Sequence, residues 1–312
     1  MNRTFSDYLV LYLKGLCMGV ADVIPGVSGG TIAFISGIYD ELIDSIRSVD
    51  GTVFKLLLKF RIAEVWRKIN ATFLISVLAG VGTSLISLAH LMTWLLETYP
   101  IPVWSFFFGL ICISAVFILR ENMHWNIGAV TALIIGIIIG AAITILAPTQ
   151  TPTNLYFIFF CGALAICAMI LPGISGAFIL LLIGKYYFMI EALTTINLPV
   201  ILVFVLGCVI GLLSFSHLLS WLLHHYRNLT IALLAGFMLG SLNKVWPWKK
   251  SFQVLGETET TMDVSIWPWN YLPETGSEPQ FVTAICFAAS GILLVVLIEK
   301  VADKIKTGKS GN

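Results

Sequence analysis

Long apolar runs, several of them close to 20 residues without a charge, divide this chain. As a helix, such a run spans the ~30 Å hydrocarbon layer of a bilayer. In lipid, each backbone group must be paired within its own helix or within a closed barrel, and barrel strands would show short alternating stretches. The sequence therefore predicts an all-α polytopic membrane protein. Its apolar segments are expected at 8–24, 28–46, 71–97, 101–119, 126–147, 155–171, 174–193, 198–223, 228–243 and 281–299.

The composition agrees with this class and excludes others. Charged residues make up 11% of the 312, against roughly 25% in a soluble domain, and mean hydropathy is +0.94. A net charge of +1 with no basic stripe excludes a nucleic-acid binder. The six cysteines form no CxxC pair and lie mostly in apolar runs, so we expect buried thiols and no disulfide framework.

The distribution of basic residues predicts the topology. If 8–46 and 155–193 each enter and return on one side, the remaining six segments cross fully. Most basic residues, including those of the 47–70 connection, then fall on one side, while Lys244, Lys249 and Lys250 fall on the other. The positive-inside rule places both termini in the cytoplasm. The N-terminal stretch lacks a small-residue cleavage site, so we expect it to be mature sequence.

The chain contains two copies of one pattern. PGVSGGTIAFISGIY at 25–39 matches PGISGAFILLLIGKY at 172–186, and HLMTWLLETY at 90–99 matches HLLSWLLHHY at 217–226. Each half thus holds a Pro-Gly re-entrant helical hairpin followed by three transmembrane helices. Because three is odd, the second half enters from the opposite side. This predicts an inverted-topology repeat with a substrate site between the halves.

Two units follow from this repeat. We expect residues 1–150 to form the first, with hairpin 8–46, the cytoplasmic connection 47–70 and three spanning helices. Residues 151–312 form the second, with hairpin 155–193, three spanning helices and the outer loop 244–280.

The hairpin tips carry the candidate site. Pro25 breaks the preceding helix, Gly26 allows a turn, and Ser28 and Ser175 are in position to cap the helices that follow. The free N–H groups and the dipole at a helix N-terminus favour an anion. Two such ends would converge on a phosphate or a carboxylate. The alternative is that PGxSG only makes a tight turn for close helix packing.

Two charges within the hairpins break the symmetry of the repeat, because Asp22 corresponds to Met169 and Lys185 to Ile38. An ionisable group inside a bilayer is costly and usually functional. Asp22 is a proton-coupling group, a partner of Lys14 or Lys185, or a cap within the hairpin. Lys185 is a phosphate ligand or a lysine that snorkels to the interface.

No enzyme motif is present. The sequence contains no HExxH, GxSxG, Walker or Cys/His metal-site pattern. We therefore expect a membrane transporter that has neither a cofactor nor a metal site.

The stretch MGVADVIPGVSGGTIAFISGIYDELI at 18–43 closely resembles the signature of the polyprenyl-phosphate (undecaprenyl-phosphate) transporter family, formerly a domain of unknown function. The resemblance extends over nearly the whole chain. It implies a flippase-like carrier in the bacterial inner membrane that returns undecaprenyl phosphate from the outer to the cytoplasmic leaflet for envelope polymer synthesis. Proton coupling, a carrier of a small soluble anion, and a membrane enzyme acting on polyprenyl phosphates remain open.

The resemblance also assigns site residues. The partners it implies are the polyprenyl phosphate and membrane lipids. From the first motif it carries over Asp22, Pro25, Gly26, Ser28, Gly29, Gly30 and Thr31. The repeat adds Pro172, Gly173, Ser175 and Gly176, with Ala177 and Phe178 making the second tip less polar than the first.

Overall fold

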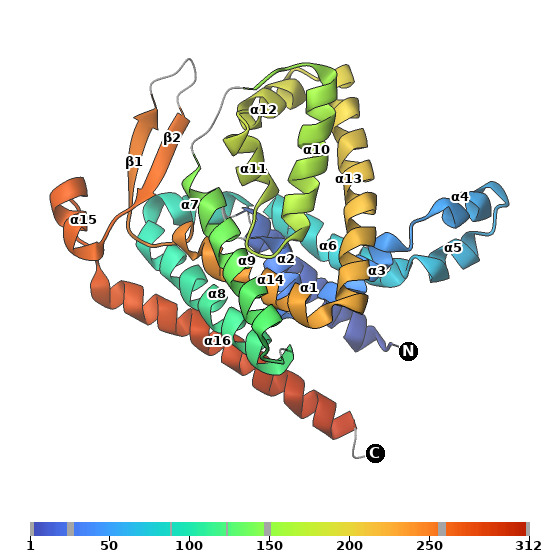
Figure 1. The fold of residues 1–312 in the computed structure, drawn as a ribbon, viewed down its shortest axis with the longest axis horizontal. Coiled ribbons are helices and arrows are strands. Elements are labelled where there is room, and N and C mark those ends of the chain that lie inside the picture. The colour runs from blue at the N-terminus through green and yellow to red at the C-terminus, as the bar shows by residue number, and fades with distance from the viewer. Residues whose placement is uncertain are drawn as a thin grey trace.

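The computed structural model describes residues 3–23, 28–87, 89–122, 124–146, 151–254 and 260–309. The described chain is mostly helical, as predicted, with one small β-hairpin (Figure 1). The first half contains α1 (Phe5–Val23), α2 (Gly29–Ile35), α3 (Tyr39–Arg47), α4 (Gly51–Leu58), α5 (Ile62–Lys68), α6 (Ala71–Ser87), α7 (Ala89–Thr98), α8 (Pro100–Asn122) and α9 (Ile127–Ile145).

The second half has a similar order of elements and adds the hairpin. It contains α10 (Leu155–Ile170), α11 (Gly176–Leu182), α12 (Tyr186–Thr194), α13 (Leu198–His225), α14 (Arg227–Gly240), the 3₁₀ turn Ser241–Asn243, β1 (Lys249–Val254), β2 (Thr260–Ser265), α15 (Pro268–Thr275) and α16 (Phe281–Lys309). β1 and β2 pair antiparallel, so the predicted loop 244–280 carries its own structure.

Helix bounds recur along the chain. α2 and α3 shifted by 147 residues give the bounds of α11 and α12, and α1 and α10 end at matching positions. α6 and α7 together, shifted by 127, span α13. The same sequence signals therefore start and stop helices in both halves.

Besides the predicted break at the Pro-Gly motif, each hairpin contains a second break that the sequence did not predict. Segments 28–46 and 174–193 were expected to be continuous, but α2 ends before α3 and α11 before α12. Gly37 (φ +70°) and Gly184 (φ +64°) adopt the left-handed conformation that ends a helix. The second break bends the chain by 107°.

Among the described residues, three helices are long and apolar enough to cross a membrane, within α8, α9 and α13. The bent pairs α5–α6 and α11–α12 raise this number to at most five. Two of the six predicted full crossings are thus not single long helices. Segment 71–97 is divided between α6 and α7, and 228–243 forms the 14-residue α14, whereas 281–299 lies within the single helix α16. The core explains the short α14, because Ile231, Leu234 and Met238 on it are fully buried by protein.

Close glycine crossings join the helices in matched pairs. In the first half, α1 packs on α6, where a Cβ on Gly15 would overlap the Val77 carbonyl oxygen. In the second half, α10 packs on α13 and Gly162 meets the Phe204 carbonyl oxygen in the same way. Small residues that let backbones approach are typical of membrane helix packing.

The remaining crossings exchange helices between the halves. α16 packs on α8, where Gly109 faces Ala288, and α9 packs on α14, where Gly236 faces Leu133. Each half therefore covers the central helix of the other. Figure 1 shows α16 running along the lower edge of the molecule.

The expectation of buried thiols is wrong for most cysteines. Cys161 is buried, but Cys17 and Cys286 are exposed and the other three are half-buried. Of the half-buried three, Cys167 and Cys208 lie in the α10–α13 crossing, where their thiols donate to the Gly211 and Gly162 carbonyl oxygens.

Candidate functional site

The first hairpin tip is organised around Ser28, which is fully buried. Its hydroxyl oxygen accepts a hydrogen bond from Gly30 N at 3.1 Å, so it caps α2 as predicted. The same hydroxyl donates to the Met169 carbonyl oxygen at 2.9 Å. One side chain therefore both starts a helix and ties the two halves together.

Asp22 caps the same helix from the last turns of α1. Its Oδ1 accepts a hydrogen bond from Gly29 N at 2.7 Å, so a carboxylate occupies the first free N–H of α2. Of the alternatives drawn from sequence, the structure thus shows Asp22 as a cap within the hairpin. Lys14 donates instead to the Ser36 carbonyl oxygen at 2.6 Å, at the other end of α2.

Gly30 and Thr31 bring the two PGxSG motifs into contact. The Thr31 hydroxyl accepts a hydrogen bond from Gly173 N at 2.8 Å. A Cβ on Gly30 would overlap the Ile170 carbonyl oxygen, which also accepts a hydrogen bond from the Tyr39 hydroxyl at 3.2 Å. The start of α2 is therefore packed directly on the loop that joins α10 to α11.

The second tip is less polar and tightly packed. Pro172 and Ser175 are buried, and Ser175 makes no side-chain cap on α11. Gly173 (φ +86°) lies so close to α14 that a Cβ would come within 2.9 Å of Met238 Cα, and Gly176 similarly approaches the backbone of α10. This tip thus supplies the backbone donor of Gly173 rather than a hydroxyl.

Lys185 lies away from both tips. It occupies the position before α12, at the far end of α11, which is about 10 Å long at 1.5 Å per residue. Its ammonium donates to the Thr151 carbonyl oxygen at 2.6 Å and lies about 6 Å from the rings of Phe157 and Phe188. The residue is 3% exposed, so protein surrounds its side chain.

The structure therefore brings together Asp22, Ser28, Gly29, Gly30, Thr31 and Gly173, with Pro172, Ser175 and Gly176 in the adjoining turn. Pro25 and Gly26 lie outside the described residues. In the described part of the chain, no three His, Cys, Asp or Glu side chains gather as a metal site.

A charged contact that sequence reasoning missed joins α3 to α13 and α14. Arg227 donates to Asp40 at 2.6 Å, and Ser220 donates to Asp44 at 2.5 Å. Arg47 donates to Ser220 at 2.9 Å, which closes the group. No local signal could have found the partners of Asp40 and Asp44, because about 180 residues separate them along the chain.

A small cavity of about 180 Å³ opens beside this contact. Its lining consists of Asp40, Asp44, Leu223, His224 and Arg227. The contact thus braces the end of α3 against the other half while leaving charged groups accessible.

Comparison with known proteins gives a consistent family. Residues 18–262 match the family described as undecaprenyl phosphate translocase-like. The chain is 47% identical to a polyprenyl-phosphate transporter of Vibrio cholerae over 302 residues, covering 96% of this chain and 98% of that protein. It is 34% identical to a polyprenyl-phosphate transporter of Staphylococcus aureus over 254 residues, covering 75% and 85%. No solved structure matches the chain at a significant level.

Proposed function

Because the chain belongs to the undecaprenyl phosphate translocase-like family, we propose that this multi-pass membrane protein carries undecaprenyl phosphate from the outer to the cytoplasmic leaflet. The observation that carries the proposal is the 47% identity to a polyprenyl-phosphate transporter across almost the whole chain. The family and its named relatives are transporters, not enzymes.

The proposed phosphate site is the contact between the two hairpin tips. A lipid phosphate needs donors for its oxygens within the membrane and an apolar flank for its prenyl tail. Gly29 N and Gly30 N at the start of α2 are such donors, and the Asp22 carboxylate and Ser28 hydroxyl hold them in the structure. We expect the phosphate to take the place of the Asp22 carboxylate.

This exchange supplies a route to proton coupling. A protonated Asp22 accepts a weaker hydrogen bond and carries no charge to repel the phosphate. Binding of the lipid phosphate and protonation of Asp22 would then favour one another. Release of the proton restores the carboxylate, which again competes for Gly29 N.

In the membrane, we propose that units 1–150 and 151–312 form an inverted repeat, with their hairpins re-entering from opposite sides. Support comes from the recurrence of helix bounds at matching positions in the two halves. The basic residues of 47–70 support an inner-membrane orientation with both termini in the cytoplasm.

The test is transport by the purified protein in liposomes, measured as movement of a labelled long-chain polyprenyl phosphate between leaflets. We expect movement with the protein and only the uncatalysed rate without it. Competition by short water-soluble phosphates as strong as by the lipid would indicate a carrier of small anions. Release of inorganic phosphate from a polyprenyl pyrophosphate would indicate an enzyme.

A further inference from the structure

The connection between α3 and α6 contains two helices that the repeated fold does not need. In the second half, residues 195–197 suffice to join α12 to α13, whereas the first half inserts α4 and α5 at the matching place. Figure 1 shows this pair projecting from the side of the molecule. An element present in only one copy of a repeated scaffold calls for a role of its own.

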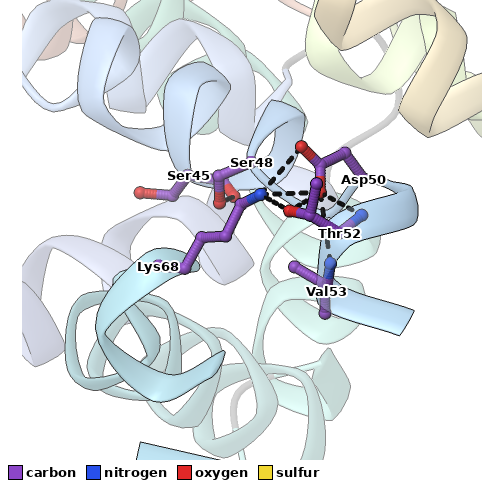
Figure 2. Close-up of polar contacts among 6 residues, drawn as sticks. All are labelled: Ser45, Ser48, Asp50, Thr52, Val53 and Lys68. Carbon is purple, nitrogen blue, oxygen red and sulfur yellow. Dashed lines mark hydrogen bonds and ion pairs between the residues drawn. The ribbon is translucent and has the colours of Figure 1, made fainter. Parts of the chain in front are cut away.

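The inserted pair is built as a defined unit. Val53 on α4 and Val65 on α5 are buried, so one face of each helix points inward. At its base, the Lys68 ammonium donates to Asp50 at 2.7 Å and also to the Thr52 hydroxyl (Figure 2). These bonds hold the pKa of Asp50 below its usual range. The pair therefore has a fixed outer face.

That outer face is apolar. Phe60, at the turn between the helices, is 87% exposed. Its φ of +54° is a strained backbone conformation for a bulky residue, and its exposed side chain gains no packing within the protein that would offset this strain. The other exposed large apolar side chains of the pair are Phe54, Leu57, Leu58, Ile62 and Trp66. These six exposed apolar side chains lie on one short pair of helices and the turn between them, and exposed apolar patches mark sites of protein or membrane contact.

Positive charge accompanies the apolar side chains. Lys55, Lys59 and Arg67 are exposed, and none of them makes a hydrogen bond or ion pair with the residues that the structure describes. Arg61 is paired with Glu64, the acidic residue of α5. Basic residues beside exposed apolar side chains match an anionic lipid surface in both charge and polarity.

The direction of α5 fits that partner. α5 meets α6 at 70°, so when α6 runs across the bilayer, α5 lies closer to the membrane plane than to its normal. At the joint, the Trp66 indole donates to the Thr72 hydroxyl of α6 at 2.9 Å, and tryptophan is enriched at this depth.

We propose that α4 and α5 form a docking surface for the anionic phospholipid face of the bilayer, with the apolar side chains inserted between headgroups and Lys55, Lys59 and Arg67 on lipid phosphates. The surface goes beyond transport itself, because it recognises bulk anionic lipid rather than the carried molecule.

The experiment uses the full-length protein in nanodiscs without polyprenyl phosphate. A fluorophore is attached to a single cysteine at Leu58→Cys, in a background whose native cysteines are replaced by alanine. Discs contain phosphatidylcholine alone or mixed with phosphatidylglycerol, each with quencher-bearing acyl chains. The matched control carries the label at Ser277→Cys, which is exposed on the other long connection.

In discs with phosphatidylglycerol, we expect lipid quenching of the label at position 58 and none at 277. Phosphatidylcholine alone should weaken the quenching. The variant Lys55→Gln/Lys59→Gln/Arg67→Gln should reduce docking about fivefold for each removed charge at low salt. Because these residues are exposed, the variant should keep the fold, and an unchanged thermal unfolding temperature checks this.

Three results would overturn the proposal. The first is that an aqueous quencher reaches the label at position 58 in every disc. The second is that lipid quenching of this label is the same with and without phosphatidylglycerol and in the triple variant. The third is that the label at position 58 is protected from the aqueous quencher only when a second copy is in the disc or soluble protein is added, which would assign the surface to a protein partner. Because docking is measured without substrate, none of these results bears on transport.

Discussion

The two hairpins have matching helix bounds but carry different side chains at their tips. α2 and α11 occupy matching positions, and the start of α2 contacts the turn that precedes α11. The first tip presents Asp22 and Thr31, where the second has Met169 and Phe178. The difference teaches that the repeat supplies the geometry, while the polar chemistry is concentrated in one copy.

The same contrast extends to the helices that follow. α3 is braced by Asp44, which binds Ser220 beside His224. The matching residues in the other copy are Glu191 for Asp44 and Glu97 for His224, two acids that cannot attract one another. Among the residues that the structure describes, the brace is therefore present in one copy only.

The largest difference between the tips should come from Asp22. Asp22→Asn keeps an oxygen acceptor for Gly29 N, so the fold should persist, but the side chain can no longer exchange a proton. We expect transport in liposomes to fall to the protein-free rate. Met169→Leu, at the matching position, should transport normally, and full activity of Asp22→Asn would remove the residue from the mechanism.

Gly30 and Ala177 compare the packing of the tips. Gly30→Ala forces a Cβ against the Ile170 carbonyl oxygen, which should destabilise the protein by about 1–3 kcal/mol in thermal unfolding. Ala177→Gly, in the exposed matching position, should cost about 1 kcal/mol or less. Equal effects would show that the first tip is no more tightly packed than the second.

Thr31 tests the bond between the tips. Thr31→Val leaves the buried Gly173 N–H without its acceptor, at a cost of about 1–3 kcal/mol in unfolding free energy. Thr31→Ser retains the hydroxyl and should recover most of that loss. A serine variant as unstable as the valine variant would contradict the bond.

The brace should contribute less, because Arg227 and Asp40 are each about half exposed. A double-mutant cycle with Asp40→Asn and Arg227→Gln should give a coupling of about 0.2–1 kcal/mol, smaller in high salt. Glu191→Gln should leave stability unchanged, because its side chain has no ion pair among the described residues. A comparable loss there would mean that both sides are braced.

The smallest effect concerns the inserted pair that only one copy possesses. Lys68 holds the pKa of Asp50 below its usual range, so this contact stabilises the pair above the ordinary aspartate pKa and weakens only as pH falls below it. The protection of α4 and α5 against hydrogen exchange, taken relative to the intrinsic exchange rate at each pH, should therefore persist near about pH 4 and fall in more acidic solution. Asp50→Asn should remove this pH dependence.

Local signals made much of the fold predictable. The PGxSG motifs and the later matched glycines set the helix starts and stops, so the repeat could be read directly. The packing of α9 on α14 and of α16 on α8 could not, because only small residues at the crossings, such as Gly136 and Gly291, mark it. Such positions are indistinguishable from other glycines until their partners are known.

In the candidate site, too, local contacts were predictable from the sequence and long-range contacts were not. Ser28 was predictable because a cap lies next to the helix that it starts. Lys185 and the pairing of Asp40 with Arg227 depend on how distant helices pack, which spacing along the chain does not encode.

The exchange of helices between the halves has a consequence for how the protein is made. α8 finds its glycine-matched partner only when α16, the last helix, has been synthesised. Until then, Gly109 on α8 lacks the backbone of Ala288 against which it packs. A chain truncated before α16 would therefore keep the contacts of α8 with α14 and α7 but leave its glycine face uncovered.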